Sequence, residues 1–210
     1  MYNQYKEKKE NKMKFYKCND NDPLYAFYQK DGLFYPVFVE KYGTKPVDVK
    51  DAYEITDEET ILALNKYMQP YEPNKPKIYM AGPLFNEGDR YSNQLNSDTL
   101  RKNGFTTFLP QEVVITNKSS ELVKGACFFM DLKAIYQCDY IVANCNGIEI
   151  DSGTAAEIGM GYALNKKMYL YKSDVRNYYN ERFKLNNFVS GLVDNRVFSS
   201  IEEIVEELKK

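Results

Sequence analysis

Strand-like and helix-like segments alternate from Lys77 to the end of the chain, and this alternation constrains the fold more than any other feature. The predicted strands cover 77–81, 105–109, 141–143 and 168–171, with a further short strand at 196–198. Helical patterns separate them, and a last helix closes the chain after Ser199 or Ser200. Strands that alternate with helices form a parallel sheet covered on both faces. We therefore predict a doubly wound, flavodoxin-like α/β domain.

The segment 138–165 is the centre of this domain, because it combines a buried strand, a polar loop and a helix. Its apolar strand ends at the turn-forming Asn144, Asn146 and Gly147. In open α/β sheets, ligands bind beyond the carboxyl ends of the strands. The sequence therefore predicts that the chemistry lies just after this strand.

The helix that follows carries the candidate nucleophile. Asp151 and its neighbours supply a helix start, because their side chains accept the free N–H groups of a first turn. If the helix begins near Thr154, Glu157 falls in the first turn, where the helix dipole favours an ionised carboxylate. Ile158 and Tyr162 are then expected to pack inward.

The chain contains no histidine among its 210 residues. This excludes His-based triads, His-ligated metals and imidazole acid–base catalysis, and leaves carboxylates, Tyr, Lys and Cys as candidate groups. The four cysteines form no Cys-x-x-Cys pair, and Cys127 and Cys138 are expected to be small core residues. We predict carboxylate chemistry without a metal or cofactor.

Composition also limits the partners. A formal charge of −2 and a pI near 5.5 give no broad basic field, so neither nucleic acid nor an anionic membrane is an expected partner. No apolar run approaches the roughly 20 residues of a membrane span, and the first residues lack the apolar stretch of a signal peptide. A cytoplasmic protein that binds small molecules is expected.

The N-terminal third has a different character. Residues 1–14 form a Lys-, Glu- and Asn-rich tail that we expect to be disordered. Residues 15–75 form a small aromatic-rich α+β module with a hairpin at Asp31-Gly32, a helix capped by Thr56 with Glu59, and a Pro-rich linker from residue 69. The module is expected to be a structural addition or an interaction surface. The catalytic domain is predicted to cover 76–210.

Four segments of the second domain carry a family resemblance. They are IYMAGPLF at 78–85, MDLKAIYQCDYIVANCNG at 130–147, DSGTAAEIGMGYA at 151–163 and GLVDNRVF at 191–198. In this order they resemble the nucleoside 2-deoxyribosyltransferase family, over roughly residues 77–198. The N-terminal module lies outside the resemblance.

The resemblance implies an enzyme that exchanges nucleobases on 2'-deoxyribonucleosides with retention of configuration. Glu157 matches the family's nucleophile, which forms a covalent deoxyribosyl-enzyme. Asp131 and Asp151 match acids that contact the base and sugar, one of them giving the leaving base a proton, and Tyr79 matches a tyrosine that positions the nucleophile. The implied partners are deoxyribonucleosides and free nucleobases.

The resemblance also implies a set of substrate-binding residues and an assembly. Gly82, Phe85 and Gly153 match positions around the substrate. Asn195 matches an asparagine that reaches into a neighbouring subunit's site, so a homo-oligomer is expected.

Three other functions are weighed against this one. Some relatives hydrolyse 2'-deoxynucleoside 5'-monophosphates with Ser and Arg groups that bind the phosphate, and Arg90, Ser92 and Ser152 are the candidates here. A nucleotide-binding protein without turnover is the non-enzymatic alternative, since a fold does not fix a function. A dinucleotide-binding oxidoreductase is disfavoured because AGPLFNEG lacks the Gly-x-Gly-x-x-Gly pattern.

Overall fold

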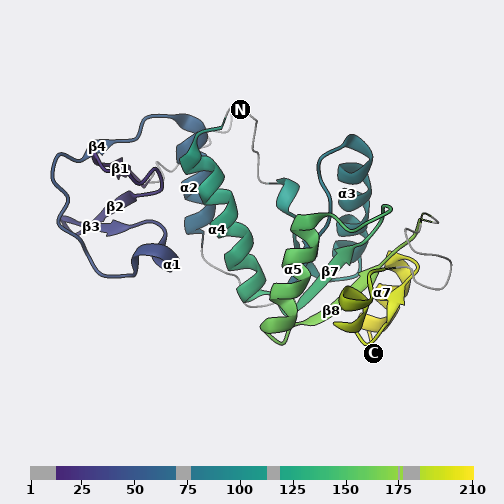
Figure 1. Cartoon of the computed structure of the whole chain (residues 1–210). Coiled ribbons are helices and arrows are strands. Elements are labelled where there is room, and N and C mark those ends of the chain that lie inside the picture. The colour runs from purple at the N-terminus through teal and green to yellow at the C-terminus, as the bar shows by residue number, and fades with distance from the viewer. Residues whose placement is uncertain (1–12, 70–76, 113–118, 175, 177–184) are drawn as a thin grey trace, which may run out of the picture. The chain divides into compact units, whose positions relative to one another are not determined.

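The computed structural model describes residues 13–69, 77–112, 119–174, 176 and 185–210. Most of the predicted Pro-rich linker, which begins at residue 69, and most of the N-terminal tail fall outside these residues. The described residues form two compact units, one made of 13–69 and 119–130 and the other of 77–112 and 131–210. Each unit has its own sheet (Figure 1).

The larger unit is built on a five-stranded parallel sheet. The strands are, in spatial order, β6 (Thr106–Phe108), β5 (Lys77–Ala81), β7 (Tyr140–Asn144), β8 (Lys167–Tyr171) and β9 (Val197–Phe198). Counted along this unit the order is 2-1-3-4-5, which is the flavodoxin-like order. The predicted fold class is confirmed, and the reversal of strand order lies between β5 and β7.

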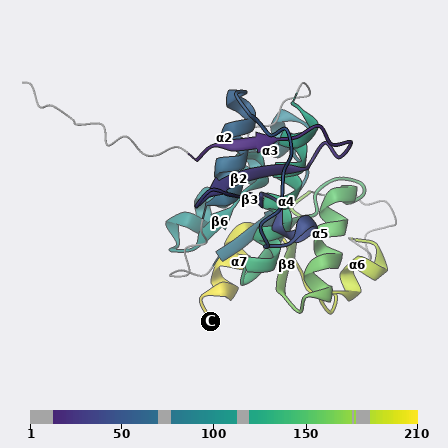
Figure 2. The same ribbon diagram turned by 90° about the vertical axis from the view of Figure 1, so that its left-hand side faces the viewer.

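Helices cover both faces of this sheet. On one face, Ile78, Met80 and Val142 share a core with α3 (Glu87–Lys102) and α7 (Ile201–Leu208). On the other, Tyr79, Ala81 and Ile141 pack with the second half of α4 (Glu121–Gln137) and with α5 (Ser152–Ala163). The two sets alternate along each strand, as side chains on a pleated strand must. The short helix α6 (Asn187–Gly191) lies beside α5 (Figure 2).

The smaller unit holds an antiparallel sheet of four short strands. Their order is β3 (Leu33–Pro36), β2 (Ala26–Lys30), β1 (Phe15–Lys17) and β4 (Tyr53–Glu54). The predicted hairpin is confirmed, because β2 and β3 are joined by Asp31 and Gly32 with φ of 53° and 78°, the left-handed values that a tight hairpin turn needs. The helices α1 (Val39–Tyr42) and α2 (Glu58–Met68) follow β3 and β4.

The first half of α4 belongs to the core of this smaller unit. The ring of Phe129 stacks on Phe38 with a centroid distance of 4.7 Å. A Cβ on Gly125 would lie 2.2 Å from Cδ2 of Leu24, so the glycine lets α4 pack closely against that side chain. Figure 1 shows α4 as one continuous helix, and its other half, from Asp131 onward, belongs to the larger unit.

The start of α2 differs from the sequence-based expectation. Thr56 is not the cap of α2, because Asp57 accepts the N–H of Thr60 at 2.8 Å instead. Both residues are good caps, and local sequence alone does not choose between them. The helices α3 and α4 begin at Glu87 and Glu121. Within the described residues, no helix combines the length and apolarity needed to cross a membrane.

Candidate active site

Tyr79 and Glu157 form the contact around which the site is built. Tyr79 is the third residue of β5 and is fully buried, and its hydroxyl donates to Oε1 of Glu157 at 2.5 Å. Its ring stacks on Phe108 of β6 with a centroid distance of 5.7 Å. Burial and the nearby carboxylates of Asp131 and Glu157 raise the pKa of Tyr79, so the phenol keeps its proton and remains a donor.

Asp131 brings a second carboxyl group to the same place from α4. Burial, and then the charge of Glu157, raise the pKa of Asp131 to about 7. Burial raises the pKa of Glu157 to about 7 as well; Asp151 adds to this rise, and the hydrogen bond from Tyr79 opposes it. Two neighbouring carboxyl groups of this kind share a proton near neutral pH. The hydrogen bond from Tyr79 favours the charged form of Glu157.

Glu157 does not lie where the sequence analysis expected it. Helix α5 begins at Ser152, so Glu157 is its sixth residue and lies beyond the first turn, and the expectation that the helix dipole keeps it ionised is wrong. Asp151 takes the cap position, and the helix starts at Ser152, two residues earlier than the start assumed at Thr154. Burial therefore controls the pKa of Glu157, and its direction is upward.

Asp151 lies at the start of the same helix, with Gly153 beside it. Its Oδ2 accepts the N–H of Thr154 at 3.0 Å and the hydroxyl of Thr154 at 3.3 Å. A Cβ on Gly153 would approach this oxygen to 3.1 Å. Asp151 is close enough to Glu157 to raise its pKa, so the three acids Asp131, Asp151 and Glu157 act on one region.

A buried amide network closes the carboxyl ends of β5 and β7. Asn144 Nδ2 donates to Asn93 Oδ1 at 2.8 Å, and Asn93 Nδ2 donates to the carbonyl of Pro83 at 2.7 Å. A Cβ on Gly82 would lie 3.0 Å from both side chains, so the glycine allows the loop after β5 to pack tightly. This network lies at the point where the strand order reverses, which is where ligands of such sheets bind.

The sequence analysis missed Asn93, although the sequence contains a signal for it. The buried residues of α3 are Asn93, Asn96, Ser97 and Leu100, at the spacing of one helix face. Three polar residues on a buried face must find partners inside the protein. That pattern predicts a polar network under the helix.

Two predicted substrate-binding residues, Phe85 and Asn195, have exposed side chains. The side chain of Phe85 is 79% exposed. Asn195 is exposed at the β9 edge of the sheet, with φ of 60° and its N–H bonded to the carbonyl of Ser190. Three strand spacings separate β9 from β5, which is about 14 Å. That distance is longer than an asparagine side chain spans.

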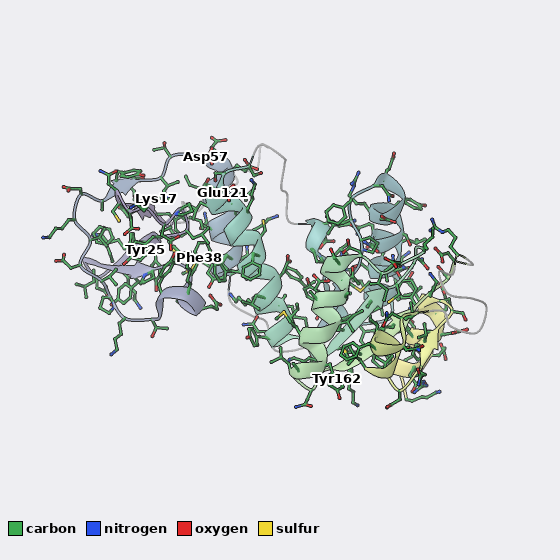
Figure 3. The ribbon with its side chains drawn as sticks, in the orientation of Figure 1. Lys17, Tyr25, Phe38, Asp57, Glu121 and Tyr162 are labelled. Carbon is green, nitrogen blue, oxygen red and sulfur yellow. The ribbon has the colours of Figure 1, made fainter. Side chains whose placement is uncertain are left out.

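Two cavities of the described residues lie away from the acids. One, of about 400 Å³, is lined by Tyr162, Tyr169 and Arg196, among others, and Figure 3 shows Tyr162 at the far end of α5. Tyr162 is 57% exposed, so its predicted inward packing is wrong. The other, of about 390 Å³, belongs to the smaller unit and includes Lys17 and Glu121. Hydrogen-bond geometry and charge, rather than cavity size, therefore identify the candidate site.

Comparison with known proteins places this geometry in a family. The nucleoside 2-deoxyribosyltransferase family model matches residues 78–197, which include the tyrosine and the three acids. An uncharacterized protein of Ureaplasma parvum serovar 3 is 32% identical over 135 residues, covering 57% of this chain and 84% of the relative.

Two solved structures are similar to the chain. A conserved protein from Enterococcus faecalis V583 is 29% identical with a TM-score of 0.56, covering 64% of this chain and 98% of the other. The 2-deoxyribosyltransferase of Bacillus psychrosaccharolyticus is 26% identical with a TM-score of 0.52, covering 61% and 90%. The family match extends over more than half of the residues, and the chain belongs to the nucleoside 2-deoxyribosyltransferase family.

Proposed function

We propose that this protein transfers 2-deoxyribosyl groups between nucleobases through a covalent intermediate on Glu157. The observation that carries the proposal is the 2.5 Å hydrogen bond from buried Tyr79 to Glu157, with the second carboxyl group of Asp131 beside it. A pair of acids that divide the roles of nucleophile and proton donor is the requirement for retaining glycosyl chemistry.

In the first step, a carboxylate oxygen of Glu157 attacks the anomeric carbon of the deoxyribosyl group. The bond between this carbon and the base nitrogen breaks, its electron pair goes to the base, and a proton from an acid neutralises the departing base. Because Tyr79 binds Oε1, we assign the attack to Oε2. The product is a deoxyribosyl ester of Glu157.

In the second step, a nitrogen of the incoming base attacks the same carbon from the opposite face. Glu157 leaves as a carboxylate, and the incoming base loses its proton to the acid that protonated the first base. Two inversions restore the original configuration. The hydrogen bond from Tyr79 favours the carboxylate in both its attacking and leaving forms.

We assign the proton donor to Asp131 rather than to Asp151. A pKa near 7 leaves Asp131 with a proton at neutral pH. Asp151 uses one carboxylate oxygen to cap α5, whereas the carboxyl group of Asp131 makes no such cap. Asp151 is then available to accept a hydrogen bond from a sugar hydroxyl.

The charge at the start of α5 favours nucleosides over 5'-monophosphates. A phosphate at this helix start would meet the carboxylate of Asp151, which already accepts the N–H of Thr154. Two of the three side chains considered for phosphate have other partners: Arg90 donates to the carbonyl of Leu84 at 3.0 Å, and Ser92 hydrogen-bonds to Tyr171. Hydrolysis of monophosphates is thereby the second candidate.

A homo-oligomer is part of the proposal. Asn195 lies beside the edge strand β9, which is three strand spacings, or about 14 Å, from strand β5 of the same subunit. An edge residue of this kind is placed to contact another subunit. We propose that Asn195 completes the site of a neighbouring copy.

The test uses thymidine or deoxyinosine with free adenine, and 2'-deoxynucleoside 5'-monophosphates in parallel, with products separated by chromatography. We expect deoxyadenosine from the wild-type protein and from Glu206→Ala, an exposed control on α7, and none from Glu157→Ala. Without an acceptor base, intact mass spectrometry should detect one deoxyribosyl group on the wild-type chain and on Glu206→Ala, and none on Glu157→Ala.

The other outcomes separate the alternatives. Free base and sugar phosphate formed only from monophosphates would identify a hydrolase. Ligand binding without any product would support the non-catalytic alternative.

A further inference from the structure

Lys172 is a buried charged residue for which the proposed reaction has no role. It follows β8 at the carboxyl end of the sheet and is only 3% exposed. Lysine is almost never buried this far unless its charge is paired. Its partners therefore indicate what it does.

The ammonium group of Lys172 has three oxygen partners. Nζ lies 2.9 Å from Oδ1 of Asp174, donates to the carbonyl of Cys145 at 3.4 Å, and donates to the carbonyl of Gly147. An ammonium group has three N–H donors. Lys172 is therefore held by three oxygens of its own chain, from Asp174, Cys145 and Gly147.

The ion pair holds the peptide groups on both sides of Gly147. The carbonyl of Gly147 accepts from Lys172, while its N–H donates to Oδ2 of Asp174 at 2.7 Å. Gly147 has φ of 112°, and a Cβ there would lie 2.9 Å from the carbonyl oxygen of Glu149. The turn that leaves β7 is thus fixed from both sides by one pair of charges.

Asn146 adds a second set of bonds between the same two segments. Its Oδ1 accepts the N–H of Ser173 at 2.8 Å and the N–H of Asp174 at 3.1 Å. Arg176 binds the outer side of Asp174 at 2.7 Å and holds that carboxylate in place. The segments 145–147 and 172–174 are therefore joined by side chains where the β-ladder of β7 and β8 has ended.

The anchored turn is close in sequence to Asp151. Three residues lie between Gly147 and Asp151, so four residue steps limit their Cα separation to about 14 Å of extended chain. Between them, Ile150 packs against the core beneath α5. Fixing Gly147 thus restricts the position of the carboxylate that faces Glu157.

We propose that Lys172, together with Asp174, is a positioning residue that anchors the loop between β7 and α5 and thereby holds Asp151 at the site. The proposal rests on the proposed function for its kinetic consequence, but the anchoring itself is independent of any activity. It assigns no contact between Lys172 and substrate.

The kinetic test compares Lys172→Met in two backgrounds. In the wild-type background we expect Lys172→Met to lower kcat/KM about tenfold or more. In the Asp151→Asn background we expect it to lower kcat/KM less than about twofold, because the carboxylate whose position Lys172 maintains has already been removed. The acid limb of the kcat/KM profile should move to lower pH in both single variants, since Asp151 raises the pKa of Glu157. Equal losses in the two backgrounds would contradict the proposal.

Hydrogen exchange tests the anchor without using activity. We expect the amide of Gly147 to exchange at least about tenfold faster in Lys172→Met and in Asp174→Asn, because both lose the ion pair. Ile204→Ala on α7 is the control, since it removes a buried side chain from the opposite face of the sheet and matches a general loss of stability. Unchanged exchange at Gly147, or the same acceleration in Ile204→Ala, would overturn the proposal.

The two readouts separate the two hypotheses. Faster exchange at Gly147 in a protein that shows no transfer with any nucleoside would leave the anchor standing and refute the proposed function. If Lys172→Met fails to fold, Asp174→Asn replaces it in the kinetic cycle, because the amide keeps an oxygen for the N–H of Gly147 while removing the charge.

Discussion

The hydroxyl group of Tyr79 has an effect on Glu157 that is opposite to the effect of burial. Burial raises the pKa of Glu157, and the hydrogen bond from Tyr79 lowers it. We expect Tyr79→Phe to move the acid limb of the kcat/KM profile to higher pH by about one unit, which corresponds to about 1.4 kcal/mol. Steady-state kinetics between pH 4 and 9 would measure the shift.

Tyr140→Phe is the matched control for that substitution. Tyr140 is on the adjacent strand β7 and packs with Tyr169 on the opposite face. Its hydroxyl should not influence Glu157. An unchanged profile in Tyr79→Phe would mean that the tyrosine does not set the ionisation of the nucleophile.

Asp131 should make the stability of the protein depend on pH. Its pKa is about 7 in the folded protein and 3.8 as the ordinary value, so the native state holds a proton that the unfolded state loses between pH 4 and 7. Stability conferred by the neutral form is complete below pH 4 and is lost as the pH rises toward 7.

Asp131→Asn removes this dependence. We expect no gain in Tm at pH 4. At pH 8.5 we expect the free energy of unfolding to rise by about 1 to 2 kcal/mol, allowing for partial exposure, which raises Tm by roughly 2–8 °C. Thermal unfolding at the two pH values measures it, with the exposed Glu206→Gln as control. Equal effects at both pH values would show that Asp131 is not a protonated buried acid.

At the scale of elements, two glycines of α5 give opposite predictions. A Cβ on Gly161 would lie 2.5 Å from Cδ1 of Ile141 and 2.9 Å from Sδ of Met168, so the helix packs closely on β7 and β8 there. Gly161→Ala should destabilise the protein by about 1–3 kcal/mol. Gly159 has no atom within 4 Å of such a Cβ, so Gly159→Ala should stabilise it by about 0.5–1 kcal/mol.

Thermal or denaturant unfolding of both variants measures the difference in sign. The two substitutions add the same methyl group to the same helix, so helix propensity cancels between them. Destabilisation by both to the same extent would mean that close packing on the sheet is not what requires Gly161.

The elements that sequence could predict are those whose signal is local. The strand at 77–81 and the core of β7 were predicted correctly, because apolar side chains in short runs mark them directly. The start of α5 was not, since Asp151, Ser152 and Thr154 all offer a cap and tertiary contacts select one. The short strand β9 depends on pairing with β8, and so its bounds are weakly encoded.

In the candidate site, too, the residues could be predicted from sequence motifs, but the contacts between them could not. Tyr79, Asp131, Asp151 and Glu157 could be listed from motifs, but their proton sharing depends on burial, which links three elements far apart in sequence. The close packing around Gly82 depends on the hydrogen bond between Asn93 of α3 and Asn144 of β7. Contacts of this kind carry no local sequence pattern.

At the scale of the whole molecule, the proposed role of Asn195 predicts complementation between subunits. Asn195→Ala and Glu157→Ala should each lack transfer activity when purified alone. Mixed and allowed to exchange subunits, they should regain about a quarter of the wild-type activity in a dimer, since one site of each mixed pair receives both intact residues. Mixing Glu157→Ala with Asp131→Asn is the control, because each of these residues acts in its own subunit's site and every site of a mixed pair then lacks one of them. No recovery in the first mixture would place Asn195 outside the neighbour's site.

The continuity of α4 bears on how such a protein changes over evolutionary time. Its first half buries Val123, Ala126 and Phe129 in the smaller unit, and its second half supplies Asp131 to the larger one. If a gene fusion exchanged the first 76 residues for another domain, the apolar side chains on the first half of α4 would become exposed. The larger unit would still need the second half of this helix. The N-terminal unit and the enzyme are therefore expected to be inherited together, and to diverge as one lineage.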